Sequence, residues 1–245
     1  MIFYRQVLKP KVLSFDLDNT IYDCETVLRK AESNFAKYLC ELYQFSDPKL
    51  QDYAFWAEIK SQCLQRQRAL ANDVTALRAY SLIEAFSLLG RELSEAEAFA
   101  LVDDFIADRS KGDVSEKMKR YLKALKERYE ICAISNGNVN TKILGVEDIF
   151  TVDFRPSLNS LNCKPHADLF VKCAAFYRVK PEEILHIGDD PYTDVTGAVQ
   201  AGCQSAWVYR GYTGISPDER YLKAVPSVSI KDVYELSSWL MPDYE

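Results

Sequence analysis

The sequence has few of the residues that hold soft metals or build disulfide frameworks. Among 245 residues there are 2 histidines, and the 7 cysteines, an odd number, are widely spread without a Cys-x-x-Cys pair. A structural zinc site needs closely spaced Cys or His ligands, and a disulfide framework needs paired cysteines. The sequence disfavours both, and reduced thiols are typical of a cytoplasmic protein.

The chain also lacks an excess of basic charge and any long apolar run. Its formal net charge is -6, whereas nucleic-acid-binding domains usually carry a basic patch and a raised pI. The start Met1-Ile2-Phe3-Tyr4-Arg5 lacks the apolar region of a secretory signal, and no run approaches membrane-spanning length. We therefore predict a cytoplasmic protein with no nucleic-acid or membrane partner, as a monomer or a homodimer.

A compact apolar run near the N-terminus ends in two carboxylates separated by one residue. Val12, Leu13 and Phe15 predict a short buried strand, and Asp16 and Asp18 follow it. In an open α/β sheet, ligands bind at the carboxyl ends of the strands. The alternative is a simple turn after a strand, because the Asp-Asn pair is favourable in turns.

After this motif the pattern is helical, with no strand-like alternation between Glu25 and Arg109. Four helices are expected. The third stops at Gly90, a plausible C-terminal glycine, and the fourth begins at Ser94-Glu95-Ala96-Glu97, which matches a capping box. We predict a helical domain at residues 23–110, inserted into a core formed by residues 1–22 and 111–245.

From Ser115 onward, helices and strands alternate. The expected helices are 115–129, 168–177 and 194–201, and the expected strands are 131–134, 184–187 and 205–209, followed by a small strand and a closing helix within 228–240. This alternation predicts an α/β fold with a central parallel sheet and crossover helices.

Polar residues follow three of these strands. They are Asp16 and Asp18 after the first, Ser135 and Asn136 after another, and Asp189 and Asp190 after a third, with Lys164 in a nearby loop. Two like charges ~4 Å apart repel by about 4 kcal/mol at an effective dielectric of ~20, so converging carboxylates need a compensating cation. Oxygen ligands suit magnesium, and no histidine or thiol pair favours a softer metal. We therefore predict a Mg²⁺ site.

These residue types suit the hydrolysis of a phosphate ester. A carboxylate beside a metal can attack phosphorus and form an aspartyl-phosphate, and a second carboxyl two residues on can protonate the leaving oxygen and then deprotonate water. Fixed donors would hold the oxygens of the transferring phosphoryl group. The predicted phosphate-binding residues are Thr20, Ser135, Asn136 and Lys164.

Four further residues allow more than one interpretation. Asp194 opens an expected helix, so it is either an N-cap or part of the metal's surroundings. Cys163 precedes Lys164 and is either a reactive thiol, because a neighbouring cation lowers a thiol pKa, or an inert loop residue. His186 lies in an apolar run and is interpreted as a core histidine, whereas His166 is the better candidate for contact with the site.

The motifs resemble those of the haloacid dehalogenase superfamily of phosphohydrolases. They match in order: Asp16-Leu17-Asp18-Asn19-Thr20, then Ser135, then Lys164, then Gly188-Asp189-Asp190 with Asp194. The resemblance implies Asp16 as nucleophile and Asp18 as acid/base. It implies magnesium held by the carboxylates of Asp16 and Asp189 and the backbone carbonyl of Asp18. Asp190 and Asp194 would support this metal site from outside its ligand set.

The same resemblance implies a Rossmann-like core with an inserted helical cap of the C1 type, because the gap from Ser135 to Lys164 is too short for the other type. More narrowly, three segments resemble bacterial phosphatases that act on FMN and on 5-amino-6-(5-phospho-D-ribitylamino)uracil. They are Phe3-Tyr4-Arg5, the Ser-Asn-Gly-Asn run from Ser135, and the stretch from Glu183 to Asp190.

Other functions remain open at this point. Phosphosugars or nucleotides are alternative substrates, and a phosphomutase would need its cap to keep water from the intermediate. Dehalogenating relatives do not need an acid at the position of Asp18, which disfavours that activity. A receiver-type signalling domain would have about half this length and no inserted cap.

The predicted cap is rich in aromatic residues, and rigid rings suit the face of a flat ligand. They include Tyr22, at the edge of the cap, and Tyr43, Tyr53, Phe55, Trp56 and Tyr80 within it. Most are expected to be packing residues, and the remainder favour a phosphorylated metabolite with a planar ring.

Overall fold

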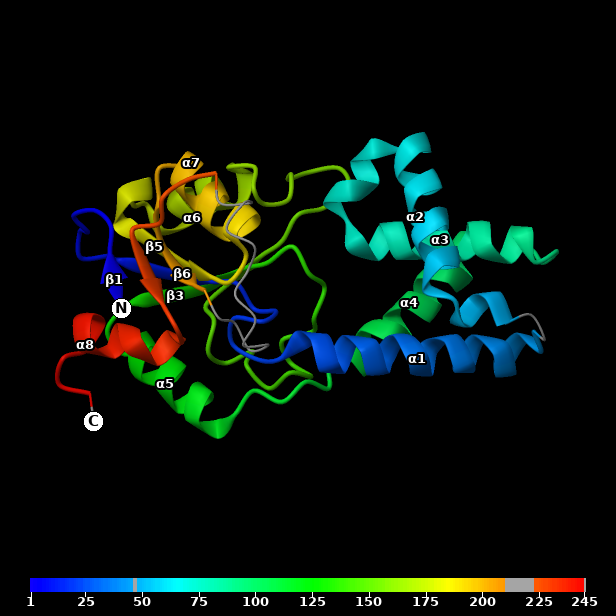
Figure 1. Ribbon diagram of the computed structural model, residues 1–245, viewed down its shortest axis with the longest axis horizontal. Helices are drawn as coiled ribbons and strands as arrows, with labels where there is room; N and C mark the ends of the chain where they lie inside the picture. The colour runs from blue at the N-terminus through cyan, green and yellow to red at the C-terminus, as the bar shows by residue number, and fades with distance from the viewer. Residues whose placement is uncertain (46–47, 210–222, 245) are drawn as a thin grey trace.

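A seven-stranded sheet forms one end of the molecule and four long helices form the other (Figure 1). The structure is a computed structural model that describes residues 1–45, 48–209 and 223–244. No helix in these ranges combines the length and the apolar character needed to cross a membrane.

The sheet has the strand order β1-β7-β6-β5-β2-β3-β4. The strands are β1 (Ile2–Phe3), β2 (Val12–Phe15), β3 (Glu130–Ile134), β4 (Asp153–Phe154), β5 (Ile184–Gly188), β6 (Gln204–Val208) and β7 (Val228–Ile230). All neighbours are parallel except β1, which pairs antiparallel with β7. The predicted α/β fold is confirmed. Strands β1 and β4 were not expected, because 2 residues are too few to show a periodic pattern.

Side chains of strand β2 alternate between the apolar layers on the two faces of the sheet. Leu13 and Phe15 belong to the cluster that contains residues of α5 (Glu116–Lys126) and the C-terminal α8 (Ser237–Leu240). Val12 belongs to the cluster on the other face, with residues of α6 (Asp168–Tyr177) and α7 (Gly197–Gln200). Helices therefore cover both faces of the sheet (Figure 1), which is why β2, β5 and β6 are buried along their whole length.

The inserted segment contains α1 (Cys24–Tyr43), α2 (Tyr53–Arg66), α3 (Val74–Leu88) and α4 (Glu95–Arg109). The predicted capping box is present, since the Ser94 hydroxyl accepts from the Glu97 backbone and the Glu97 carboxylate accepts from the Ser94 backbone. Helix α3 ends just before Gly90, whose φ of 75° is the left-handed conformation that glycine adopts without strain.

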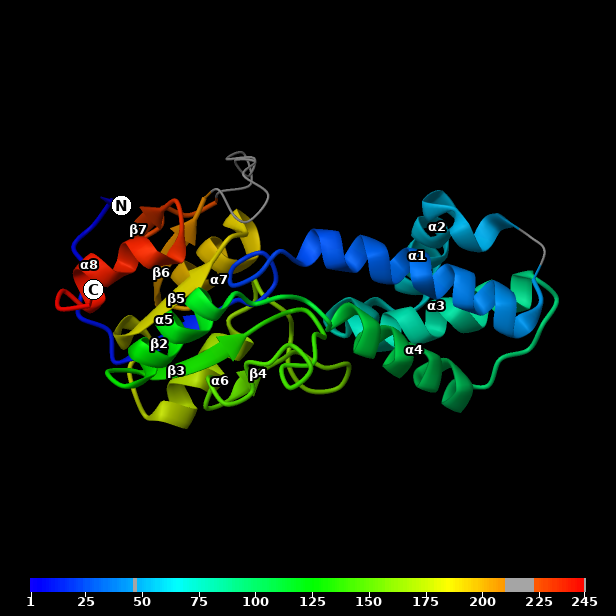
Figure 2. The ribbon, with the colours of Figure 1, turned by 90° about the horizontal axis from the view of Figure 1, so that it is seen from below.

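The four helices enclose apolar clusters of their own, away from the sheet (Figure 2). Leu39, Leu82 and Phe105 are fully or almost fully buried in one of these clusters. Of the predicted cap aromatics, Tyr43 packs edge-on against Phe86 with ring centroids 4.7 Å apart. Tyr53, in contrast, is 79% exposed, so the prediction that most but not all of these rings pack in the core is confirmed.

Candidate active site

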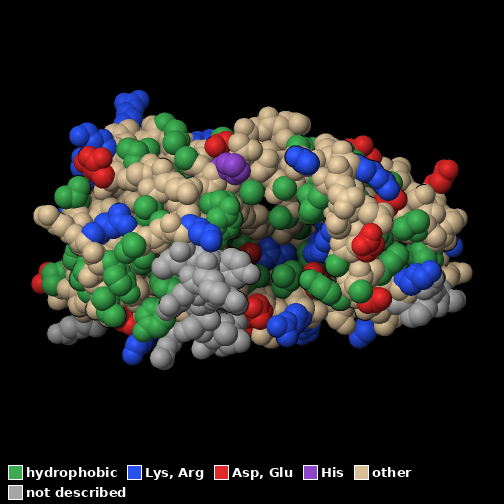
Figure 3. All heavy atoms as spheres, turned by 45° about the horizontal axis from the view of Figure 1, so that its top comes forward, with side chains coloured by type: hydrophobic (Ala, Val, Ile, Leu, Met, Phe, Trp, Pro, Cys, Tyr) green, Lys and Arg blue, Asp and Glu red, His purple; other side chains and the backbone are tan. Residues whose placement is uncertain are grey.

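The predicted site residues meet at the carboxyl edge of the sheet, around β2. This strand pairs with β3 on one side and with β5 on the other, and the chain passes from β3 and β4 back across β2 to reach β5. A crevice forms where the strand order reverses in this way. Asp16, Ser135 and Asp189 each follow one of these strands, and the surface between sheet and helices is hollowed (Figure 3).

Lys164 is the buried cation of the site. Its ammonium donates to Asp16 Oδ1 at 2.8 Å, to Asp194 Oδ1 at 2.6 Å and to the carbonyl oxygen of Ile134 at 2.6 Å. Burial alone would lower the pKa of Lys164, but the two carboxylates outweigh it and raise the pKa above its usual value. The ammonium therefore stays charged beside Asp16.

Three carboxylates lie close together at this edge and suit a hard divalent cation. Oxygens of Asp16, Asp189 and Asp194 lie within 4.8 Å of one another. Burial, together with the neighbouring carboxylates, raises the pKa of Asp16 well above its usual value and that of Asp189 to about 7. Such shifts mark negative charge that nearby cations do not balance, and a bound divalent cation would balance it. The donor set fits the predicted magnesium.

Asp190 caps the segment that follows β5. Its carboxylate accepts from the backbone nitrogens of Tyr192 at 2.8 Å and Thr193 at 2.6 Å, at the start of a turn over Pro191–Thr196. Asp194 lies inside this turn, so its interpretation as an N-cap is wrong. The helical segment begins earlier than expected because proline favours the first helical position. The supporting role of Asp190 at the metal stays a prediction.

Asp194 is instead a buried acceptor at the centre of the site. Besides Lys164, it accepts from the backbone nitrogen of Asp190 at 2.9 Å and lies 3.2 Å from His186 Nε2. Burial would raise its pKa, but Lys164 and His186 lower the pKa below its usual range. A Cβ at position 188 would lie 2.3 Å from this carboxylate, so only Gly188 leaves room for it.

The two histidines and Cys163 lie as follows. His186 is fully buried, with Nδ1 2.9 Å from Ser14 Oγ and Nε2 on Asp194, which confirms a satisfied core histidine. His166 is exposed. Burial raises the pKa of the Cys163 thiol and outweighs the effect of Lys164, which favours the inert reading of this cysteine.

Asn136 and Thr20 hold other site residues in place. The Asn136 carboxamide donates to the backbone oxygen of Lys164 at 2.9 Å and accepts from its nitrogen at 2.8 Å. Thr20 Oγ1 donates to Asp189 Oδ1 at 3.3 Å. The buried Ser135 Oγ accepts from the Gly137 nitrogen at 3.1 Å, which leaves its proton for another acceptor. Their phosphate-binding roles stay predictions.

Asp18 contacts the end of helix α4 and is not one of the three clustered carboxylates. Its two carboxylate oxygens lie 3.0 and 3.1 Å from Arg109 Nη2, and one of them also accepts from the Tyr22 hydroxyl. Arg109 is 3% exposed and donates through Nη1 to Asn138 at 2.9 Å. A Cβ at Gly137 would lie 2.5 Å from Asp18 Oδ2, so glycine is required here as well.

Arg109 was missed in the sequence. At the end of a helix an arginine is already favourable because it complements the helix dipole, so its presence signals nothing more. Its contact with Asp18 joins residues 91 positions apart, and no local spacing predicts it.

The chain matches a family model over residues 10–202, described as haloacid dehalogenase-like hydrolase. It belongs to this family. The predicted superfamily is therefore confirmed, and so is the prediction that the chain is an enzyme of the hydrolase class.

Two relatives of this chain are named as phosphatases, a class of hydrolase. The chain is 32% identical over 214 residues to the 5-amino-6-(5-phospho-D-ribitylamino)uracil phosphatase YigB of Escherichia coli strain K12, covering 85% of this chain and 87% of that protein. It is 33% identical over 104 residues, 40% of this chain and 43% of the relative, to a glyceraldehyde 3-phosphate phosphatase of Pyrococcus furiosus. The predicted resemblance to riboflavin-pathway phosphatases is confirmed by the first of these.

The fold is shared with a solved structure of a 2-haloacid dehalogenase from Pseudomonas syringae pv. Tomato DC3000. The TM-score is 0.78 at 26% sequence identity, and the match covers 94% of this chain and 97% of the other. One fold thus carries different reactions in this family, and the site residues have to decide between them.

Proposed function

We propose that this chain is a magnesium-dependent phosphomonoesterase that hydrolyses a small phosphorylated metabolite through an aspartyl-phosphate. The observation that carries the proposal is the buried group in which Asp16 lies against Lys164 and shares a cluster with Asp189. A carboxylate placed beside a fixed cation and a metal site can attack phosphorus and does not need a proton removed first.

In the first step, an oxygen of Asp16 forms a bond to phosphorus while the bond from phosphorus to the leaving oxygen breaks. The carboxyl group of Asp18 supplies the proton that the leaving alcohol takes up. The Ser135 hydroxyl donates to the phosphoryl oxygens, whose charge needs donors fixed in advance. The Lys164 ammonium donates to them through the N–H that Asp16 gives up when its carboxylate bonds to phosphorus.

In the second step, a water molecule attacks the phosphorus of the aspartyl-phosphate, and Asp18 takes its proton. The bond between Asp16 and phosphorus breaks, which releases inorganic phosphate and restores the carboxylate. Magnesium, held by Asp16, Asp189 and the backbone carbonyl of Asp18, would neutralise the phosphoryl charge. Asp194 holds Lys164 in position throughout.

The inserted helices would act as a cap over this site. We take residues 23–110 as the cap and residues 1–22 and 111–245 as the hydrolase core. The largely separate apolar clusters of the sheet and of the inserted helices support this division, and Arg109 joins the last cap helix to Asn138 and Asp18 of the core. A cytoplasmic location and a monomeric or homodimeric state stay predictions.

For the substrate we propose a phosphorylated metabolite with a planar ring, such as FMN or the phosphoribitylamino-uracil that the Escherichia coli relative is named for. Support comes from Trp56 and Tyr53, which line a cavity among the cap helices. Phosphosugars are the alternative, favoured by the name of the relative in Pyrococcus furiosus.

The experiment is a hydrolysis screen over FMN, the ribitylamino-uracil phosphate, nucleoside monophosphates and phosphosugars. Treatment with a chelator should abolish phosphate release, and added Mg²⁺ should restore it, because oxygens of Asp16, Asp189 and Asp194 lie within 4.8 Å of one another and repel without a cation between them. Calcium should restore little, since its larger shell is looser. Full activity in chelator would contradict the metal site.

A parallel assay with 2-haloacids separates the two reaction classes of the fold. Release of halide faster than release of phosphate from any ester would overturn the proposal. We expect no halide release, because a dehalogenase does not need the acid that Asp18 provides.

A further inference from the structure

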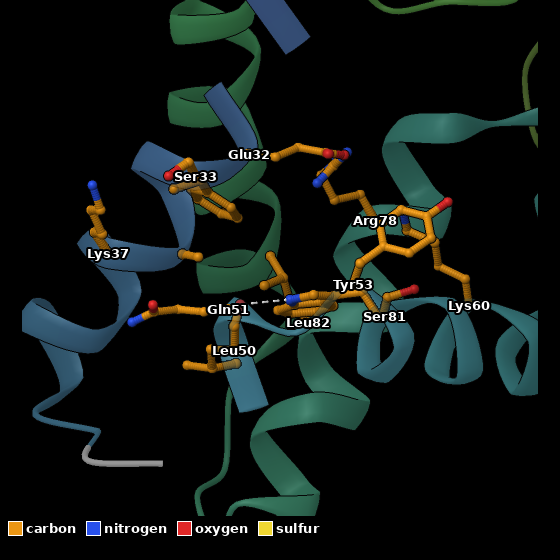
Figure 4. A pocket seen from close by; sticks show the side chains of 13 residues that line it. Glu32, Ser33, Lys37, Leu50, Gln51, Tyr53, Lys60, Arg78, Ser81 and Leu82 are labelled. Atoms are coloured by element: carbon orange, nitrogen blue, oxygen red, sulfur yellow. Dashed lines mark hydrogen bonds and ion pairs between the residues drawn. The ribbon is translucent and has the colours of Figure 1, made fainter. Parts of the chain in front are cut away.

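Two adjacent cavities lie among the inserted helices, and the nearer one reaches Asp18. The near cavity, about 290 Å³, is lined by Asp18, Arg109 and Gly137 together with residues of α1 to α4. The far cavity, also about 290 Å³, lies among α1, α2 and α3 (Figure 4). Small-molecule sites usually measure about 300–1,000 Å³, so each cavity alone is small and only the two together reach that range comfortably.

Three charged residues line both cavities: Glu32 from α1, Lys60 from α2 and Arg78 from α3. Because each is shared, the three form the boundary between the two cavities, which we call the junction. Figure 4 shows the side chains of Glu32 and Arg78 pointing toward one another. Arg78 Nη2 lies 3.3 Å from Glu32 Oε1, and the Arg78 guanidinium also stacks on the Phe105 ring, 3.7 Å from its centre.

Lys60 differs from the other two because it makes no hydrogen bond or ion pair with any residue in the described part of the chain. Burial and, to a lesser degree, the charge of Arg78 lower the pKa of Lys60, and the attraction of the nearby Glu32 carboxylate offsets only part of this. A partly buried ammonium that lacks an acceptor loses hydration without recovering it, and an acceptor oxygen brought by a ligand would supply the missing hydrogen bond.

The far cavity is mainly apolar beyond this junction. Phe35, Leu50, Trp56 and Leu82 contribute to its wall. The Trp56 indole donates to the backbone oxygen of Leu50 at 2.9 Å, so the ring is held in one orientation. A fixed indole among aliphatic side chains suits a flat, apolar group.

We propose that the two cavities form one site for the leaving group of the phosphate ester, with Lys60 as the residue that selects for length. The substrate class is a phosphate monoester whose leaving group carries acceptor oxygens midway and ends in a flat ring. The acceptor oxygens bind Lys60 at the junction, and the ring enters the far cavity. This inference rests on the proposed function and adds to it the residues that discriminate between esters with different leaving groups.

The site discriminates between phosphate esters by the length of their leaving groups. A short ester ends inside the near cavity and gains nothing from Lys60 or Trp56. A long ester reaches both and takes binding energy from a part of the molecule remote from the reacting phosphorus.

The test compares Lys60→Met with Lys30→Met, a matched control on an exposed residue of α1 that lines neither cavity. For FMN, kcat/KM should fall about 10-fold or more in Lys60→Met, mainly through KM, because a hydrogen bond to a charged group is lost. For glyceraldehyde 3-phosphate it should change by less than about twofold. Lys30→Met should resemble the wild type with both.

A loss that is equal for the two esters, or a loss with FMN below about threefold, overturns the inference while the phosphatase assignment stands. If the wild type cleaves no ester of the screen, the proposed function fails, and binding of riboflavin, followed by its fluorescence, then decides on the leaving-group site. Weaker binding in Lys60→Met than in Lys30→Met supports the leaving-group site. Equal binding overturns it.

Discussion

Two buried or partly buried lysines show how differently the sheet edge and the helical insertion are built. Lys164 at the sheet edge donates to three acceptors within 2.8 Å, and its pKa is raised. Lys60 in the insertion has no such partner in the described ranges, and its pKa is lowered. The first cation is positioned before any substrate arrives, whereas the second gains its partner from a ligand.

The difference follows from what each region has to recognise. A transferring phosphoryl group has the same geometry in every ester, so donors fixed in advance cost nothing in reorganisation. Leaving groups differ from ester to ester, and a site that leaves its polar group unpaired penalises the ligand that cannot satisfy it. The groups that act on the phosphoryl group are therefore fixed by contacts within the protein, whereas Lys60, which discriminates between leaving groups, gains its acceptor only from a suitable ligand.

The largest effect is expected at the nucleophile. Asp16→Asn should reduce kcat by about 10⁴-fold or more, because the change removes the attacking oxygen's charge and a metal ligand together. Steady-state phosphate release measures it, and circular dichroism should show an unchanged fold. Near-normal turnover in a folded variant would rule out the assigned mechanism.

The comparison of the two lysines predicts losses of stability of different size. Lys164→Met should lower the free energy of unfolding by about 3–5 kcal/mol, because it leaves Asp16 and Asp194 buried beside each other without their cation. Lys60→Met should lower it by less than about 1 kcal/mol, since no pair is broken. Urea titrations of both variants without metal measure the difference, and similar losses would contradict the comparison.

Arg109 belongs to the insertion and yet acts on the sheet edge. Arg109→Met should reduce kcat by about 10-fold to 100-fold with a smaller change in KM, because Asp18 loses the partner that orients its carboxylate. The loss should be greatest for esters with poor leaving groups, which depend most on the proton from Asp18.

Arg109→Lys and an exposed arginine serve as references for this effect. Lysine restores charge but not the planar fork, so we expect partial recovery. Arg66→Met on the exposed surface of α2 should leave kcat unchanged. An equal loss of kcat for good and poor leaving groups would show that Arg109 acts on the fold alone.

The smallest effect tests whether the insertion can be weakened without touching the chemistry. Ser94→Ala removes the hydroxyl of the capping box and should cost about 1 kcal/mol of stability. Because Ser94 lies at the N-terminal end of α4, opposite the end that carries Arg109, kcat should not change at saturating substrate. A matched fall in kcat would mean that the stability of α4 and the position of Arg109 are linked.

Much of the site could be predicted because its residues follow local patterns. Asp16, Ser135 and Asp189 each come directly after a short apolar strand, and strand ends in a parallel sheet meet at one edge. The capping box at Ser94 is equally local. The N-cap assignment of Asp194 failed because Asp190, followed by a proline, was a better cap at the same place.

The sequence by itself determined the strand ends, two of the three members of the acidic cluster (Asp16 and Asp189) and the order of the four helices, because each depends on residues within a few positions of one another. Only the tertiary structure decided what Asp18 contacts and where the insertion is hollow. Arg109 reaches Asp18 across 91 positions, and Glu32, Lys60 and Arg78 meet from three separate helices. Such meetings depend on how helices pack, and packing is a property of the whole chain that no short pattern records.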